Sequence, residues 1–338
     1  MTSNKSVKRA LMKHSHNNYG VVNIGDHIQS CAAEQFISNV DFYIDRDQLN
    51  SPDIVPCKLI VNGWFTDAPQ NWPLNPNIEP LFISFHLQPT SAEVILADKK
   101  NIEYLKKHSP IGCRDYKTVE LLEQKGIEAY FSFCLTTTLG KNYKSDNKTD
   151  NIYFVDLFYT YDKSVFTKIN WLSMLKLPPY KKLKKLKNYF SKPPSIADYI
   201  PSEIISSSTT LKHFVDNNKT NEELYDLAKG YLKKYAEAKL VVTSRIHCAL
   251  PCLDLGTPVL FLMEGLKDES LHMSRLRGIL DHMNILTLDS KEKVNTLFGK
   301  QMNVFNPNEI DWNNPPKNPE SYSPLSQELI NKCQKFMG

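Results

Sequence analysis

Residues 239–264 read KLVVTSRIHCALPCLDLGTPVLFLME and predict a strand, a helix and a second strand in direct succession. Residues 240–242 are apolar and rich in valine, as in a buried strand. The helix that follows should end at Gly256, because glycine adopts the left-handed conformation that is common after a helix. Residues 259–263 are again apolar and predict the second strand. This order is that of a βαβ unit and predicts an α/β fold.

Charged and titratable side chains stand where this helix should begin. Thr243 and Ser244 carry hydroxyls that can cap the helix, and Arg245 and His247 follow in its predicted first turn. Free backbone N–H groups and the positive end of the helix dipole attract anions there. A guanidinium adds a fixed charge, and an imidazole can carry a proton. The spacing predicts an anion site with an acid beside it, although it fits a surface arginine and a packed histidine equally well.

Composition limits the class of protein. With 338 residues, 41% of them hydrophobic, the chain can form two domains, which we place at residues 1–145 and 146–338. A net charge of only +4, without a basic stripe, argues against nucleic acid as a partner. No apolar run approaches the roughly 20 residues that span a bilayer, and no signal peptide is evident, so we expect a cytoplasmic protein. The seven cysteines lack zinc-site spacing, which predicts reduced thiols and no metal site.

Four other polar side chains are predicted at strand ends or in loops. Asp26 can cap a helix after a glycine-bearing loop, His86 and Arg114 each follow a predicted strand, and His213 lies in a loop. Open α/β sheets bind ligands at the carboxyl ends of their strands. On its own segment, however, Arg114 would be expected to pair with Asp115, and both histidines would be expected to be ordinary polar loop residues.

A basic segment interrupts the second half of the chain. Residues 176–192 contain seven lysines and no acid, with apolar side chains at helical spacing. A solvated charged face is the usual explanation of such a run. The alternative is a peripheral contact of Lys181 to Lys192 with the inner face of the cytoplasmic membrane, because lysines around an apolar stripe suit an anionic surface.

Several short motifs occur in an order and spacing that are specific when taken together. They are Asn23-Ile24-Gly25-Asp26, Asn62-Gly63-Trp64-Phe65, Ser84-Phe85-His86, Gly112-Cys113-Arg114-Asp115 and Thr243-Ser244-Arg245-Ile246-His247. With these motifs the chain resembles the polysaccharide pyruvyl transferase family across most of its length. The resemblance departs at Cys134, where many members of the family carry an aspartate, so no carboxylate role is assigned there.

The resemblance implies a fold and an activity. It implies a glycosyltransferase-B-like fold, with two Rossmann-like domains facing across a cleft and the last helix packing back on the first domain. It also implies transfer of a pyruvyl group from phosphoenolpyruvate to a sugar or lipid-linked oligosaccharide of a bacterial cell-surface glycan, often as a ketal, without a cofactor. The alternatives are a nucleotide-sugar-dependent glycosyltransferase of the same fold and a non-catalytic glycan-binding protein.

The candidate residues divide into catalytic and binding groups. His247 is the first choice for the acid, with His86 and His213 in reserve, and Asp26 would orient or deprotonate the attacking hydroxyl. Arg114 and Arg245 would bind the carboxylate and phosphate of the donor, and we predict that they meet across the cleft although they are far apart in sequence. The remaining substrate contacts are expected from Ser244, Asn23, Gly25, His213 and Asn62.

Overall fold

The computed structural model describes residues 7–14, 21–161, 193–216, 218–266 and 272–338. The segment Lys181 to Lys192, for which we expect a membrane contact, lies outside the described residues. Among the helices that are described, none is long and apolar enough to cross a membrane. All seven cysteines are buried and free of disulfide bonds, as the sequence predicted.

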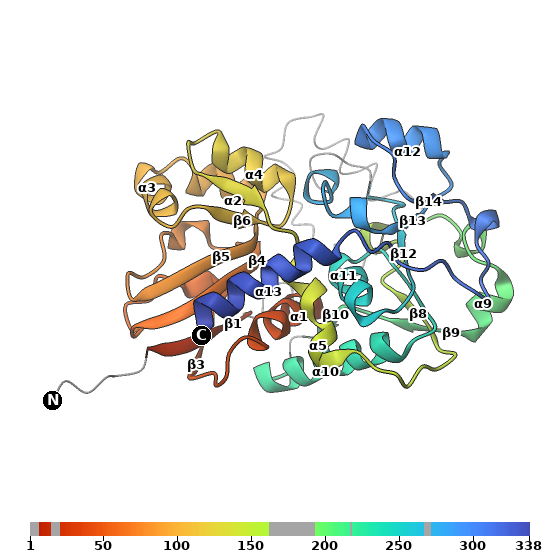
Figure 1. Ribbon diagram of the computed structural model, residues 1–338, viewed down its shortest axis with the longest axis horizontal. Helices are drawn as coiled ribbons and strands as arrows, with labels where there is room; N and C mark the ends of the chain where they lie inside the picture. The colour runs from red at the N-terminus through yellow and green to blue at the C-terminus, as the bar shows by residue number, and fades with distance from the viewer. Residues whose placement is uncertain (1–6, 15–20, 162–192, 217, 267–271) are drawn as a thin grey trace, which may run out of the picture.

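Two six-stranded parallel sheets form the two halves of the molecule (Figure 1). Numbered in chain order within each sheet, the strands of both halves are arranged 2-1-3-4-5-6. This doubly wound order confirms the predicted α/β class with two Rossmann-like units. The first sheet contains β3 (Phe42–Asp45), β1 (Lys8–Lys13), β4 (Cys57–Phe65), β5 (Ile78–Leu87), β6 (Ile111–Cys113) and β7 (Ala129–Phe131). The second contains β9 (Ser208–Leu211), β8 (Ile152–Val155), β11 (Leu240–Thr243), β12 (Val259–Leu262), β13 (Asn284–Leu286) and β14 (Val304–Phe305).

The same strand order places an equivalent crevice in each half. In a doubly wound sheet, ligands bind where the chain reverses its direction of winding, outside the carboxyl ends of the two strands that flank this point. That point lies between β1 and β4 in the first half, and between β8 and β11 in the second. The more specific likeness to a glycosyltransferase-B arrangement stays a prediction.

Helices cover the sheets and fill the space between the halves (Figure 1). Residues 89–107 contain two helices, because Asp98 accepts a hydrogen bond from Lys100 N and starts the second. Residues 202–207 form a short helix, which buries Ile204. The helices are α1 (Ile24–Glu34), α2 (Pro89–Ile95), α3 (Lys99–Lys107), α4 (Tyr116–Glu123), α5 (Gly140–Tyr143), α9 (Ser202–Ser207), α10 (Asn221–Glu237), α11 (Ile246–Leu255), α12 (Lys291–Phe298) and α13 (Ser323–Met337).

Each half has a hydrophobic cluster of its own, and a further cluster joins the two halves. This shared cluster includes Leu11 and Val22 from the first half and Val241 and Phe261 from the second. Within it, α1 packs against α10 and α11. A two-stranded antiparallel ribbon adds backbone pairing between the halves, since β2 (Val21–Asn23) pairs with β10 (Phe214–Asp216). The halves are therefore joined by packing and by hydrogen bonds.

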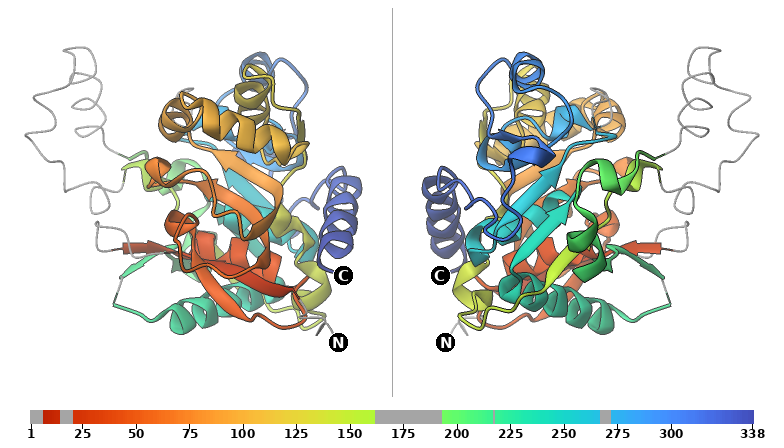
Figure 2. Two further views of the ribbon diagram at one scale, coloured as in Figure 1. Left: turned by 90° about the vertical axis from the view of Figure 1, so that its left-hand side faces the viewer. Right: turned by 90° about the vertical axis from the view of Figure 1, so that its right-hand side faces the viewer.

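The last helix returns to the first half. Lys58 Nζ, on β4, donates to the carbonyl oxygen of Phe336 at 2.7 Å, and Arg9 Nη2, on β1, donates to that of Met337 at 3.3 Å. Both side views show α13 along one flank of the molecule (Figure 2). The chain thus crosses between the halves both near its middle and near its end.

Candidate functional site

A pocket of about 380 Å³, which we call the central pocket, lies between the two halves. His14 follows β1, Trp64 is near the end of β4, and Ser244 and Arg245 follow β11, so the pocket lies beside the crevices of both sheets. The ribbon of β2 and β10 contributes Val22, Asn23 and Phe214 to its wall. Its volume is in the range of small-molecule sites.

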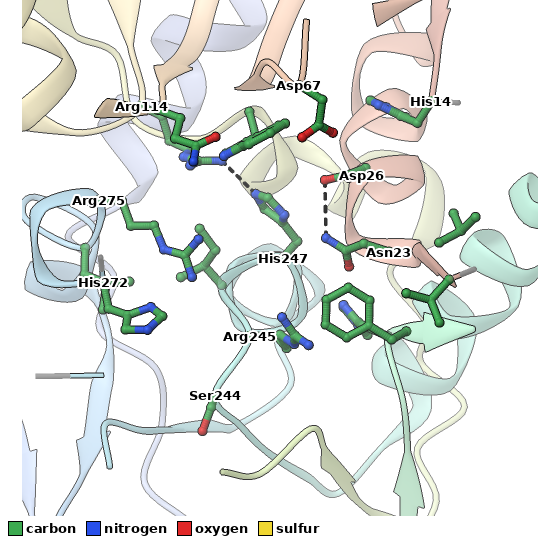
Figure 3. Close-up of a pocket in the computed structure, with 18 of the residues that line it drawn as sticks. His14, Asn23, Asp26, Asp67, Arg114, Ser244, Arg245, His247, His272 and Arg275 are labelled. Carbon is green, nitrogen blue, oxygen red and sulfur yellow. Dashed lines mark hydrogen bonds between the residues drawn. The ribbon is translucent and has the colours of Figure 1, made fainter. Parts of the chain in front are cut away.

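The charge of the central pocket favours an anionic ligand. Its lining includes four arginines and two aspartates. Burial lowers the pKa values of His14, His213 and His247, which favours their neutral forms. Figure 3 shows three of these arginines around His247. The four are Arg46, Arg114, Arg245 and Arg275, and the two aspartates are Asp26 and Asp67. Arg114 and Arg245 thus line one pocket, as predicted.

Arg114 is the most deeply buried of these cations, with 1% of its surface exposed. Its Nη1 donates to Gln29 Oε1 at 3.3 Å and to His247 Nε2 at 3.0 Å, while Nε has no hydrogen-bond partner among the described residues. No carboxylate in the described part of the chain forms an ion pair with it. Burial lowers the pKa of Arg114, because desolvation disfavours the charged form. A buried guanidinium that faces a pocket without an ion-pair partner among the described residues is suited to bind an anion.

The expected pairing of Arg114 with Asp115 is wrong. Asp115 has an extended backbone, and it accepts hydrogen bonds from Thr118 N, which starts α4, and from Thr118 Oγ1. Its other oxygen lies 2.6 Å from His86 Nδ1. Neighbouring residues of an extended segment project to opposite sides, so Asp115 points away from the guanidinium. Burial alone would raise the pKa of Asp115, but the charge and hydrogen bond of His86 lower it overall.

Arg245 is fixed in orientation by two contacts. Its Nε donates to Asp156 Oδ2 at 2.7 Å, and its guanidinium lies 4.3 Å from the centre of the Phe214 ring. Asp156 follows β8, so the ion pair connects the ends of β8 and β11, the two strands that flank the crevice of the second sheet. The ribbon and this ion pair together hold the arginine at the rim of the pocket.

The predicted start of the central helix needs correction. Arg245 is the N-cap residue of α11 and Ile246 its first helical residue, so Arg245 lies just before the first turn. The hydroxyl of Ser244 does not cap the helix, because it donates to the carbonyl oxygen of Leu262 on β12 at 2.9 Å. Thr243 Oγ1 accepts from Arg245 N at 2.9 Å and fixes the turn. Ser244 still lines the central pocket, and its role in substrate binding stays a prediction.

His247 is a neutral hydrogen-bond acceptor in this arrangement. Because the guanidinium of Arg114 can only donate, His247 Nε2 must accept, which leaves the ring proton on Nδ1. Burial, followed by the charge of Arg114, lowers the pKa of His247 well below its ordinary value. Gly25 allows this position, since a Cβ atom there would lie 3.2 Å from His247 Nδ1. A bound anion would be needed to favour the protonated ring.

Asp26 faces the pocket from the first turn of α1 (Figure 3). We had expected Asp26 to cap this helix, but it does not. Asn23 does, because its Oδ1 accepts from Gly25 N at 3.1 Å. Asp26 Oδ1 accepts from Gln29 Nε2 at 3.1 Å, and Oδ2 lies 3.8 Å from Arg46 Nη1. Burial raises the pKa of Asp26 although Arg46 and other arginines oppose the shift. A carboxylate with a raised pKa is a better proton acceptor.

The motif at residues 62–65 has a structural explanation. Asn62 Nδ2 donates to the carbonyl oxygen of Gln29 at 3.0 Å and ties β4 to α1. Gly63 has a φ of +95°, and a Cβ atom there would lie 2.5 Å from Gln29 Oε1. Trp64 lines the pocket, with Arg46 stacked 4.7 Å from its ring centre. The motif therefore leaves room for the Gln29 side chain, which bridges Asp26 and Arg114.

The other predicted site residues occupy different positions. His213 lines the pocket, where burial lowers its pKa and its Nε2 lies 2.9 Å from the hydroxyl of Tyr235. His86 is 3% exposed and lies behind the pocket wall, as do Gly25 and Asn62. Burial lowers the pKa of His86 although Asp115 opposes the shift. His86, Gly25 and Asn62 support the residues that line the pocket. Direct roles of His213 and His86 in binding or catalysis remain predictions.

Sequence reasoning missed several residues of the pocket. Arg46 pairs with Asp47 at 2.8 Å and Asp67 at 3.1 Å, and thereby connects three acidic side chains through its contact with Asp26. Arg46 and Asp47 follow β3, and Asp67 follows β4. Their position after a strand was the feature of the sequence that could have indicated a site. Loop residues of the second half had no such signal. The missed residues are His14, Arg46, Trp64, Asp67, Gln88, His272 and Arg275.

The fold and the site define an α/β protein that has two Rossmann-like halves and an arginine-rich pocket between them. A family model described as polysaccharide pyruvyl transferase matches residues 23–264. That range is more than half of the chain, and the chain belongs to this family. It begins at Asn23 and includes Asp26, Arg114 and His247, while His14 and Arg275 lie outside it. A search of curated proteins finds no match.

Proposed function

We propose that the protein transfers the pyruvyl group of phosphoenolpyruvate to a sugar of a polysaccharide or its precursor and forms a ketal with two hydroxyls. The observation that carries the proposal is the buried Arg114 guanidinium, which has no carboxylate partner among the described residues and contacts a neutral histidine. Phosphoenolpyruvate has a carboxylate and a phosphate close together. Such a ligand would supply the negative charge that this part of the pocket lacks.

The arginines around His247 can bind the two anionic groups from different sides. Arg114 and Arg275 both act on His247 electrostatically, and Figure 3 shows Arg114 and Arg245 on opposite sides of His247. A planar guanidinium can hold a carboxylate or phosphate through two parallel hydrogen bonds. These groups neutralise the donor directly, so the proposal includes no cofactor. In the described part of the chain, no group of His, Cys, Asp or Glu side chains has the arrangement of a metal site.

The proposed chemistry begins with a proton transfer. Protonated His247 gives its proton to the methylene carbon of the donor, and a C–H bond forms as the carbon–carbon double bond breaks. A sugar hydroxyl then forms a C–O bond to the central carbon and gives its proton to Asp26. The bond from that carbon to the phosphate oxygen breaks, and a second hydroxyl closes the ketal. Two hydroxyl protons are released in total. One replaces the proton that His247 gave to the new methyl group, and the other leaves with the phosphate.

A direct assay distinguishes this function from the alternatives. Protein is incubated with phosphoenolpyruvate and a panel of sugars and lipid-linked oligosaccharides, and phosphate release and acceptor mass are measured. Release of one phosphate for each ketal added supports the proposal. Turnover of a nucleotide sugar, without use of phosphoenolpyruvate, would identify a glycosyltransferase instead. Saturable glycan binding without turnover of either donor would identify a binding protein.

The pH dependence of the reaction should differ between free and bound enzyme. In the free enzyme the pKa of His247 is lowered, so kcat/KM should rise as pH falls and protonates the ring. The anionic donor raises that pKa in the complex, so the basic limb of kcat should lie about one pH unit or more higher. At low pH both parameters should fall as Asp26, whose pKa is raised above 3.8, becomes protonated. Because glutamine does not titrate, the pH profile of the His247→Gln variant shows what ionisation of the donor contributes by itself.

Gln29 should contribute by positioning two groups at once. The side chain is 2% exposed and joins Asp26 to Arg114. We expect Gln29→Leu to lower kcat/KM for phosphoenolpyruvate by about 10-fold, because both partners lose a fixed neighbour. Gln29→Glu should weaken donor binding further, since its carboxylate would neutralise Arg114. Kinetics and calorimetric titration measure both effects, and equal donor affinity in all three proteins would contradict the positioning role.

A further inference from the structure

The two sides of the central pocket differ in charge. Arg275 and His272 line it from the second half, whereas the two aspartates of its lining, Asp26 and Asp67, come from the first half (Figure 3). An anionic donor is attracted to the arginines and repelled by the carboxylates. The first-half side is therefore better suited to a neutral substrate. The chemistry proposed above gives one hydroxyl proton to Asp26 and assigns no group to the proton of the second hydroxyl.

Arg46 holds the two aspartates as a pair. Its Nη1 lies 3.8 Å from Asp26 Oδ2, and its Nη2 donates to Asp67 Oδ2 at 3.1 Å. No described residue donates a hydrogen bond to Asp67 Oδ1, and 56% of this side chain is exposed. Burial of the remainder raises the pKa of Asp67, although the charge of Arg46 opposes the shift. A carboxylate that is fixed at one oxygen and accessible at the other can accept a proton in a defined direction.

A buried ring nitrogen on the same side lacks a hydrogen-bond donor. His14 is 8% exposed, lines the central pocket and interacts electrostatically with Arg46. Ser30 Oγ donates to the carbonyl oxygen of Met12 at 2.9 Å, so it must accept from His14 Nε2 at 3.0 Å. His14 Nδ1 is then an acceptor, and it has no partner among the described residues. A substrate hydroxyl could donate to this atom, whereas an ionised carboxylate or phosphate could not.

We propose that the acceptor sugar binds on the first-half side of the central pocket and that Asp67 is the base that closes the ketal. This inference rests on the proposed function and adds to it a catalytic residue and the location of the second substrate. The half-buried ring of Trp64, which lines the same side, offers apolar surface to the C–H face of a sugar. Asp26, Asp67 and His247 line one cavity, so no side chain has to move aside before donor and acceptor meet.

The two carboxylates divide the proton transfers between them. As the first hydroxyl forms its C–O bond to the central carbon, its proton passes to Asp26. The bond from that carbon to the phosphate oxygen then breaks, and its electron pair leaves with the phosphate. The second hydroxyl forms the other C–O bond, and its proton passes to Asp67 Oδ1. One proton later returns to His247 and the other leaves with the phosphate, so the overall balance is unchanged.

The pair also defines the class of acceptor. Because one guanidinium holds both carboxylates, two hydroxyls can reach them together only if they lie close to each other on one sugar ring. A sugar with a single free hydroxyl would reach one carboxylate and could not close a ketal. We therefore expect acceptors with two neighbouring free hydroxyls.

Replacement of Asp67 by asparagine should uncouple phosphate release from ketal formation, because asparagine keeps the size of the side chain but cannot accept the proton. We expect the yield of ketal per phosphate to fall by about 10-fold or more, while the donor dissociation constant from calorimetric titration stays at the wild-type value. The cationic intermediate that cannot close its ring either returns a methyl proton to His247 and becomes an enolpyruvyl ether, or adds water and breaks down to pyruvate and free sugar. Proton NMR separates the ketal methyl group from the vinyl protons of the ether, and lactate dehydrogenase with NADH measures pyruvate.

Two further aspartates provide controls. Asp53→Asn makes the same change at an exposed carboxylate outside the pocket and should keep the wild-type yield. Asp47→Asn removes the partner of Arg46 at 2.8 Å, but Asp47 does not line the pocket, so this variant should also keep the yield. An equal fall in Asp47→Asn, or an unchanged yield in Asp67→Asn, would overturn the role of Asp67, and ketal formation by wild type would leave the proposed function standing. If wild type releases no phosphate from phosphoenolpyruvate with any acceptor, both the proposed function and this inference are wrong.

Discussion

Replacement of His247 by glutamine should lower kcat for pyruvyl transfer by about 100-fold or more, because glutamine cannot give a proton to carbon at neutral pH. Donor affinity should change much less. The amide oxygen of glutamine can accept the hydrogen bond that Arg114 Nη1 now gives to His247 Nε2 at 3.0 Å. Phosphate release at saturating donor and acceptor gives kcat, and calorimetric titration gives the donor dissociation constant.

His282→Gln provides a matched control for that experiment. His282 lies outside the central pocket on a short 3-10 turn, where its Nδ1 is 2.8 Å from Ser321 Oγ. This variant should turn over at the wild-type rate. If His247→Gln also keeps a near wild-type rate in single-turnover experiments, His247 is not the acid. His213, which lines the pocket, and then His86 would be the next residues to replace.

Replacement of Arg114 by methionine should lower kcat/KM for phosphoenolpyruvate by about 100-fold to 1,000-fold, the usual result of removing a buried charged partner. The free energy of unfolding should stay near the wild-type value or rise. Burial of this guanidinium is not offset by an ion pair with any described carboxylate, and methionine has a similar length without the charge. Thermal unfolding with and without phosphoenolpyruvate measures both effects. At 100 times its dissociation constant the donor should stabilise wild type by about 2.7 kcal/mol and the variant hardly at all.

Two other variants separate charge from packing at this position. Arg114→Lys should weaken donor binding while keeping the charge, because a lysine cannot reproduce the paired hydrogen bonds of a guanidinium. Arg9→Met, which removes a hydrogen bond to Met337 far from the pocket, should leave donor kinetics unchanged. Wild-type stabilisation of Arg114→Met by the donor would contradict the binding role. A large loss of stability in the same variant would show that the arginine is mainly structural.

Local pattern was sufficient for the elements that carry the site. Apolar runs and their end residues predicted the strands that precede Arg114 and Arg245, and strand ends in an α/β sheet lie on its ligand-binding side. The meeting of these two arginines in one pocket therefore followed from fold class. The predictions that were wrong concerned the side-chain hydrogen bonds at the starts of two helices. Ser244 and Asp26 were expected to cap helices, but a strand carbonyl and a nearby amide compete for their side chains.

Other parts of the site had no local signal. Arg275 lies in a loop between β12 and β13, and nothing in its own segment marks it as a pocket residue. Arg46 directly follows a strand, but its role became recognisable only when the fold brought Asp26 and Asp67 to it from other segments. The role of Gln29 required distances across three elements, since its two amide atoms bond to different partners. Such residues are defined by tertiary packing, which a single sequence does not encode in a short window.

The core that runs through both halves has a consequence for how substrates enter. A hinge rotation that widened the cleft would have to separate α1 from α10 and α11 and break the pairing of β2 with β10. Each of these contacts is buried or hydrogen-bonded, so an open state would lie at high free energy and be sparsely populated. In that case the described residues of the unliganded protein would already hold the arrangement proposed to bind the donor, and little affinity would be lost to a rotation of the two halves. Selectivity would then come from the charge and shape of these residues rather than from closure of the halves.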